Sequence, residues 1–303
     1  MKLRWHEQID WVDAIPFFLV HAAALVLAFY VGVTWKLAAL CAALYFGRMA
    51  AITIGFHRYF AHRSFKTSRP VQFLLALLSE TSAQKGVLWW AANHRDHHRY
   101  SDQEGDIHSP KDGFFWSHVG WILSMKHAET GEIKDFSKYP ELRLLNEYHL
   151  VPPVALALAC YFIGGLPALT WGFFVSTVLL WHGTFLVNSL NHVWGTRRYQ
   201  TTDTSRNNAL LALITCGEGW HNNHHHFMSS ANQGFFWWEI DLSYYLIRAM
   251  QAVGLVWDVR TPPSKALAEG RIARVERPEA VLRGRSHGLL QGKPQAGLQA
   301  DAA

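Results

Sequence analysis

Four apolar runs, each close to the roughly 20 residues that a helix needs to cross a bilayer, limit the possible folds of this chain most strongly. They cover residues 14–33, 35–56, 150–169 and 171–190, and Arg48 interrupts the second. Very short connections join the first run to the second and the third to the fourth. The sequence therefore predicts an all-α integral membrane protein with four transmembrane helices in two hairpins.

Basic residues lie on one side of these predicted helices. Residues 32–36 and 164–170, which connect the helices of each hairpin, carry Lys36 as their only charge. The other polar segments contain many Lys and Arg residues, and such segments face the cytoplasm in membrane proteins. We therefore expect a multi-pass protein of a bacterial inner membrane, with both termini in the cytoplasm. Residues 57–149 and 191–262 should form a cytosolic helical cap.

The composition agrees with a membrane protein. The 303 residues are 50% hydrophobic and only 17% charged, with a net charge of +5. The basic residues flank apolar runs, which favours membrane lipid over nucleic acid as a partner. The three cysteines form no CxxC pair, so neither a disulfide framework nor a thiolate metal site is predicted. Residues 1–262 are expected to form one membrane domain, followed by a mostly disordered tail at 263–303.

Histidine is the unusual component, because eight of the 18 histidines fall in three short groups and a ninth belongs with them. Two groups have the spacing i, i+3, i+4, which places three imidazoles on one face of a helix. A third group is a pair five residues apart, which diverges on an ideal helix and converges only where the helix bends or frays. A single histidine lies at the end of the fourth apolar run. The nine are His57 and His62; His94, His97 and His98; His192; and His221, His224 and His225.

This set of histidines predicts a centre of two metal ions. Neutral imidazole binds zinc, copper, iron and nickel. Nine ligands exceed the about four to six that one ion takes up. A structural zinc site would need only about four ligands and would commonly include Cys. Zinc also has no redox chemistry, so two iron ions beside a pocket in the lipid are the preferred interpretation.

The other nine histidines are interpreted without a metal. His21 and His182 lie inside apolar runs, where a hydrogen-bonded structural role is expected. The remaining seven lie in polar segments and are interpreted as surface residues: His6, His108, His118, His127, His149, His226 and His287.

Five motifs, in this order and spacing, resemble the membrane fatty-acid desaturases, specifically the acyl-CoA (stearoyl-CoA type) Δ9 branch. They are HRYFAHR at 57–63, HRDHHRY at 94–100, GFFWSHVGW at 113–121, NSLNHVWG at 188–195 and EGWHNNHH at 218–225. The resemblance implies an oxygen-dependent fatty-acyl desaturase in which the nine histidines bind two Fe(2+) ions and Asn188 holds a metal-bound water. Dioxygen would be the co-substrate, and a cis double bond, expected at Δ9, would be inserted into a saturated acyl chain.

The resemblance also implies residues of a substrate tunnel. Met49 shares a helical stripe with Tyr45 and His57, and the helix rise places it about 12 Å from His57. We hypothesise that the bulky Met49 shortens the tunnel and favours palmitoyl over stearoyl chains. The expected tunnel residues are Tyr45, Met49, Gln84, Trp90 and Thr184.

The sequence leaves the carrier of the acyl chain open. Ala92 and Asn93 stand where the animal enzymes have an Arg–Asp pair that holds the CoA head group. Acyl-CoA, acyl-lipid and carrier-protein substrates are therefore all candidates. A separate electron carrier, ferredoxin-like or cytochrome-like and served by a reductase, is expected to dock on the cytosolic face. The alternatives are a di-iron membrane lipid or alkane hydroxylase and a non-catalytic membrane metal-binding protein.

Overall fold

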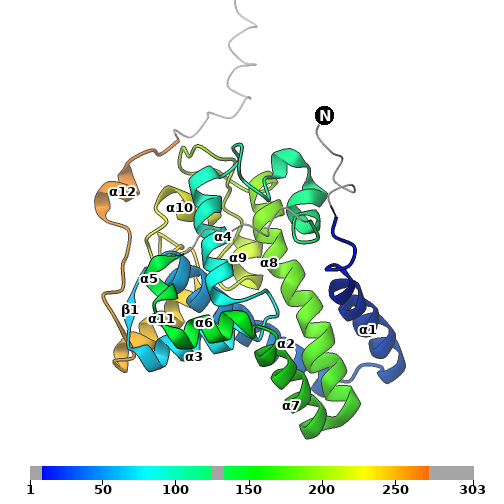
Figure 1. Cartoon of the computed structure of the whole chain (residues 1–303). Helices are drawn as coiled ribbons and strands as arrows, with labels where there is room; N and C mark the ends of the chain where they lie inside the picture. The colour runs from blue at the N-terminus through cyan, green and yellow to red at the C-terminus, as the bar shows by residue number, and fades with distance from the viewer. Residues whose placement is uncertain (1–8, 125–132, 273–303) are drawn as a thin grey trace, which may run out of the picture. The chain divides into compact units, whose positions relative to one another are not determined.

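Helices make up almost all of the regular structure (Figure 1). The computed structural model describes residues 9–124 and 133–272. The expectations for His6, His127, His287 and residues 273–303 of the C-terminal tail lie outside the described residues, whereas residues 263–272 of the expected tail are described and include the short helix Ser264–Ala268.

Four long apolar helices form where the four runs were predicted. They are α1 (Ile15–Val31); α2 (Trp35–Ala51), which continues as the π-helix η2 (Ile52–Ala61); α7 (Val151–Ala168); and the π-helix η6 (Leu169–Val175), which continues as α8 (Ser176–Val193). Two continuous stretches, Trp35–Ala61 and Val151–Val193, are long and apolar enough to cross a membrane, whereas α1 has 17 residues. A membrane protein is thus supported, while the number of spans stays a prediction.

The second long stretch reverses direction at two glycines. Gly164 and Gly165 have non-helical backbone angles inside the apparent 43-residue helix. Gly165 has φ +63°, in the left-handed region that favours glycine. The break lies inside α7, so the part of α7 before Gly164 packs against η6 as the predicted hairpin.

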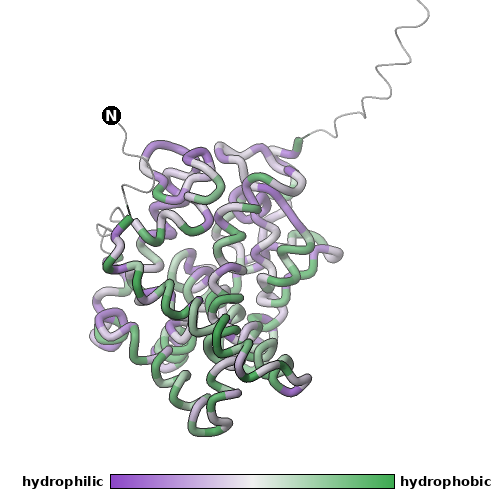
Figure 2. The backbone as a smooth tube through the Cα atoms, turned by 90° about the vertical axis from the view of Figure 1, so that its right-hand side faces the viewer, coloured by the Kyte–Doolittle hydropathy of each residue, from purple (hydrophilic) through white to green (hydrophobic). Residues whose placement is uncertain are grey.

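Apolar side chains cover the outside of the long helices. Figure 2 shows hydrophobic residues along the helices at the lower end of the view and hydrophilic residues in the loops at the upper end. Phe29 in α1 is 92% exposed and Ile163 in α7 is 87% exposed. Such exposure of large apolar side chains is typical of a surface that contacts lipid.

Polar side chains inside the apolar helices bind one another. Arg48 is buried and donates hydrogen bonds to Ser176 Oγ at 2.5 Å and Thr177 Oγ1 at 2.8 Å, which joins α2 to α8. His21 Nε2 lies 3.1 Å from His182 Nε2, and His182 Nδ1 lies 3.0 Å from His118 Nε2. These contacts fit the hydrogen-bonded structural role expected for His21 and His182. They also show that His118 is more than a surface residue.

Short helices and one two-stranded sheet form the polar end. The sheet pairs β1 (Lys66–Thr67) with β2 (Val256–Trp257) in antiparallel register, a small departure from all-α. The helices before α7 are α3 (Arg69–Glu80), α4 (Val87–Tyr100), η3 (Pro110–Asp112), η4 (Trp116–Gly120), α5 (Lys134–Ser137) and α6 (Pro140–Glu147). Those after α8 are α9 (Ala209–Ile214), α10 (His221–His226), α11 (Leu242–Ala252) and α12 (Ser264–Ala268). The main hydrophobic core lies where η2 packs against α3 and α4.

Candidate metal centre

The structure brings all nine predicted histidines together in two groups. Within each group, the ligand nitrogens lie within 4.8 Å of one another. The first group has five members, His57, His62, His94, His98 and His224. The second group has four, His97, His192, His221 and His225.

A π-helix explains how His57 and His62 converge. The backbone N–H of His62 donates to the carbonyl oxygen of His57 at 3.1 Å, five residues earlier. Hydrogen bonds of this i→i+5 type define a π-helix, which is rare and often found at functional sites. The wider turn brings the two rings to 4.8 Å between centroids. The bend expected from the sequence is therefore a π-helix.

The two three-histidine boxes are each divided between the groups. On α4, His94 and His98 belong to the first group and His97 to the second. On α10 the outer pair, His221 and His225, belongs to the second group and His224 to the first. Residues i and i+4 lie nearly above one another on a helix, so each outer pair faces one group and the middle histidine faces the other.

The start of α4 is held by side chains from two other helices. Glu80 Oε1 accepts a hydrogen bond from the backbone N–H of Val87 at 2.9 Å. Asn146 Oδ1 accepts from the N–H groups of Leu88 and Trp89, both at 3.0 Å. The N–H groups that have no partner within the helix are thereby satisfied. These bonds fix the position of the helix that carries three of the nine histidines.

The spacing of the imidazole nitrogens fits a bound metal. In the first group, Nε2 atoms of successive histidines approach to between 2.9 and 3.1 Å. Nitrogens on neighbouring corners of an octahedron lie about 3.0 Å apart when each is about 2.1 Å from the metal. His192 Nε2 and His221 Nε2 in the second group are 3.1 Å apart. Lone pairs held this close repel one another unless a proton or a metal ion lies between them.

Four carboxylates fix the orientation of ligand histidines, and sequence reasoning missed all four. Each accepts a hydrogen bond from the Nδ1–H of a histidine, which leaves Nε2 deprotonated and free to bind a metal. The distances are 2.7 Å for His57–Glu218, 3.2 Å for His97–Asp106, 3.3 Å for His192–Asp102 and 2.7 Å for His225–Asp203. Such carboxylate–histidine pairs are common around metal ligands.

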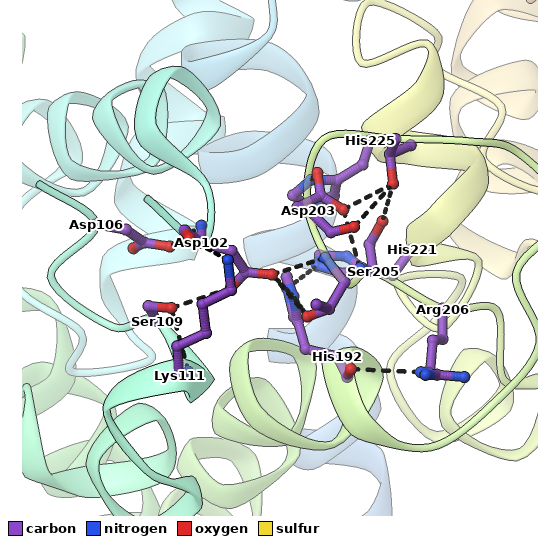
Figure 3. Close-up of polar contacts among 12 residues, drawn as sticks. Asp102, Asp106, Ser109, Lys111, His192, Asp203, Ser205, Arg206, His221 and His225 are labelled. Atoms are coloured by element: carbon purple, nitrogen blue, oxygen red, sulfur yellow. Dashed lines mark hydrogen bonds and ion pairs between the residues drawn. The ribbon is translucent and has the colours of Figure 1, made fainter. Parts of the chain in front are cut away.

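Asp102 also joins two loops of the cap. Its Oδ2 accepts from the backbone N–H and the hydroxyl of Thr204 at 2.7 and 2.6 Å, and its Oδ1 accepts from Ser109 Oγ at 3.1 Å. Lys111 Nζ donates to the carbonyl oxygen of Asp102 at 2.7 Å. Figure 3 shows Asp102 between Ser109 and Lys111 on one side and His192 on the other. Asp102 thus links the loop after α4 to the end of α8.

Burial favours the neutral form of six of the nine histidines. Burial and the neighbouring histidines lower the pKa values of His62, His94, His98, His221 and His224 well below the usual range. Burial lowers the pKa of His225 to about 4, although Asp203 raises it. Burial alone would raise the pKa of Glu218, but His57 and Arg58 hold it below its ordinary value. Neutral imidazole is the form that binds metals.

A cavity of about 720 Å³ adjoins the first group. Gln84, Trp90 and Thr184 line it as predicted for the tunnel, and so do His94 and Asn188. His108, interpreted from the sequence as a surface residue, is buried and also lines the cavity.

Two expected tunnel residues, Tyr45 and Met49, are not among the described residues that line the cavity. Both pack beside Gly183, where a Cβ atom would lie 2.6 Å from Tyr45 Oη and 3.0 Å from Met49 Cε. Tyr45 Oη donates a hydrogen bond to the carbonyl oxygen of Ile214 at 2.8 Å. The role of Met49 in chain length therefore stays a prediction.

Comparisons with known proteins agree with this geometry. The model of the family "Fatty acid desaturase" matches residues 33–258. The chain is 39% identical over 264 residues to "Delta-9 acyl-lipid desaturase 2" of Arabidopsis thaliana, covering 86% of this chain and 85% of the relative. It is 37% identical to "sn-1 stearoyl-lipid 9-desaturase" of Anabaena variabilis, with coverage of 85% and 96%. It is 36% identical to "Icosanoyl-CoA 5-desaturase" of Limnanthes douglasii, with coverage of 86% and 75%.

These relatives correct one sequence-based expectation. Their names include lipid-bound and CoA-bound substrates, so the acyl-CoA branch is not singled out. The family match covers most of the chain, and each relative is more than 30% identical over most of its own length. The chain therefore belongs to the membrane fatty acid desaturases, the oxidoreductases that introduce double bonds into acyl chains.

Proposed function

We propose that this protein is an oxygen-dependent acyl-lipid desaturase that inserts a cis double bond at Δ9 into a saturated chain esterified to a membrane lipid. The observation that carries the proposal is the pair of buried all-histidine groups beside an apolar cavity. The lipid carrier and the Δ9 position come from the names of two relatives. An acyl chain has no reactive polar group, so the protein must supply a redox centre and alignment.

The nine histidines would hold two Fe(2+) ions. When bound, these ions would supply the redox chemistry that uses dioxygen as the oxidant. The four carboxylates orient the imidazoles, and the apolar cavity wall excludes water from the chain. Asn188 lies on the cavity wall together with His94, which supports its proposed role in holding a metal-bound water.

We also propose the predicted topology for this function. The four apolar helices would all cross the membrane, with the termini, the cap and the histidines on the cytoplasmic side. A separate ferredoxin-like or cytochrome-like electron carrier would then reach the cap from the cytoplasm. The distribution of hydrophobic residues in Figure 2 supports this arrangement.

Expression in a desaturase-deficient host tests the function. Mass spectrometry of intact lipids should locate a new double bond at Δ9, and purified protein should contain iron. His225→Ala should abolish the product. His226→Ala is the matched control, because His226 Nε2 contacts the carbonyl oxygen of Ala266 at 2.8 Å and lies outside both groups. A hydroxylated product would establish the hydroxylase alternative, and activity in protein without iron would refute the di-iron centre.

A further inference from the structure

The cavity runs along one face of a long helix. Residues of η6 and α8 between Phe173 and Asn188 line one side of it, which we call the floor. An α-helical segment of this length, between Phe173 and Asn188, spans about 20 Å, comparable to an extended palmitoyl or stearoyl chain. The floor residues are Phe173, Trp181, Thr184, Phe185 and Asn188.

The two walls of this cavity come from different hairpins. Phe17 and Val20 of α1 form one wall, and Val154, Leu158 and Tyr161 of α7 form the other. The three α7 residues are 54%, 50% and 49% exposed, so they line the cavity and reach the outer surface at once. We call this opening between α1 and α7 the lateral slot. Its edges are apolar and belong to the helices that carry the lipid-facing surface.

Charges at the polar end of the slot are balanced. Among the described lining residues, Lys85 is the only Lys or Arg and Asp13 is the only acidic residue. Burial lowers the pKa of His149, and the nearby charge of Lys85 lowers it further. A CoA head group carries several phosphates and would require several cations. One cation balanced by one carboxylate fits the ester region of an uncharged or zwitterionic lipid better.

Nearby cap arginines are already paired with carboxylates. Arg95 and Arg63 both donate to Asp135, at 2.9 to 3.0 Å. Arg69 binds Glu141 through two hydrogen bonds of 2.6 and 2.7 Å. These pairs leave less free positive charge for a polyphosphate close to the histidine boxes.

We propose that the acyl chain of an intact membrane glycerolipid enters this enzyme sideways, through the lateral slot between α1 and α7. The glycerol ester stays near Asp13 and Lys85 at the polar end of the slot, the middle of the chain lies beside the histidines, and the rest of the chain extends along α8 towards Phe173. The proposal rests on the proposed function for its substrate class. It adds the entry route, since a chain carried by CoA would arrive from the aqueous side.

Ala157 and Ala159 of α7 provide a matched pair of variants. Ala157 lines the cavity, whereas Ala159 is exposed and is not among the lining residues of the described chain. Ala157→Trp should obstruct the slot, and Ala159→Trp adds the same ring on the lipid side. Ala157→Leu is a smaller obstruction that serves if the Trp variant does not accumulate.

The first measurement is binding, which requires no metal. The full-length, metal-free protein is placed in vesicles containing a trace of phosphatidylcholine with a diazirine on its acyl chain, irradiated, and mapped by peptide mass spectrometry. We expect labelling of the α1 and α7 slot residues, reduced about tenfold in Ala157→Trp and unchanged within about twofold in Ala159→Trp. If all exposed apolar helices are labelled equally and Ala157→Trp has no effect, the proposal that the acyl chain enters through the lateral slot is refuted.

The second measurement separates the slot from the proposed function. Iron-loaded protein with a chemical reductant is offered the same phosphatidylcholine in vesicles or soluble acyl-CoA, and double bonds are counted in each. Desaturation of the intact lipid that falls about tenfold in Ala157→Trp supports the slot. If the slot residues are labelled but no double bond forms in any substrate, the proposed desaturase activity is refuted while lipid entry through the lateral slot is still supported. If only acyl-CoA is desaturated and Ala157→Trp does not change its rate, lipid entry through the lateral slot is refuted while desaturase activity is still supported.

Discussion

Replacing Asp203 by Asn should selectively weaken the second histidine group. Asp203 Oδ2 accepts from His225 Nδ1 at 2.7 Å, while Oδ1 accepts from Ser205 N and Thr201 Oγ1, both at 2.9 Å. An Asn side chain can keep both Oδ1 bonds, but it then presents its NH₂ group to His225. Two donors cannot face each other, so His225 must accept at Nδ1 and move its proton to Nε2.

The size of the effect follows from this change of tautomer. His225 Nε2 is buried without a hydrogen-bond partner in the described structure, as expected for a metal ligand. Once protonated, it cannot bind a metal. Removal of an orienting partner typically lowers metal affinity about 10- to 100-fold, which corresponds to about 1.4 to 2.7 kcal/mol. The five-histidine group keeps all its ligands, so we expect the iron content to fall from about two to about one per chain.

Anaerobic titration of the metal-free protein with ferrous iron measures both affinities, and iron analysis after desalting gives the content. Asp258→Asn is the control, because Asp258 is an exposed carboxylate that pairs only with Lys66 among the described residues. If Asp203→Asn binds two irons with unchanged affinities, the carboxylate does not set the tautomer of His225. An equal loss from both groups would also contradict the reasoning.

Three other predictions concern chain length, packing and metal. Met49→Ala should shift the product towards longer chains if Met49 limits the cavity, and an unchanged product profile by gas chromatography would reject that role. Gly183→Ala forces a Cβ to within 2.6 Å of Tyr45 Oη and should lower stability by about 1–3 kcal/mol. Gly47→Ala, with no atom within 4 Å of the new Cβ, should be nearly neutral in the same thermal unfolding assay. Ferrous iron at 100 times its dissociation constant should stabilise the protein by about 2.7 kcal/mol for each of the two sites, reversed by chelation, because it binds only the folded groups; an unchanged melting temperature would argue against a metal centre.

The sequence was sufficient to predict which nine histidines the structure brings together, because their signal is local. The i, i+3, i+4 spacing needs only a helix, and the long apolar runs needed only their length. The pairing of His57 with His62 was less certain, since an ideal α-helix separates residues five apart. It depended on a π-helix, which the spacing alone does not specify.

The rest of the centre depends on contacts between distant parts of the chain. Asp203 lies 22 positions before His225 and Asp102 lies 90 positions before His192, so no motif connects them. Met49 was assigned to the tunnel from its depth along the helix. Depth does not show which face of that helix borders the cavity, and Met49 packs against α8 at Gly183 instead.

On both α4 and α10, the middle histidine belongs to one group and the outer pair to the other. A movement of either helix therefore affects both groups. A rotation of α4 about its axis would move His97 relative to one group while moving His94 and His98 relative to the other. The same holds for α10, with the groups interchanged. Neither group can therefore shift alone, and the spacing between the two groups depends on α4 and α10, which each contribute to both. In the proposed di-iron centre, this arrangement would hold the two ions at a fixed separation through successive turnovers.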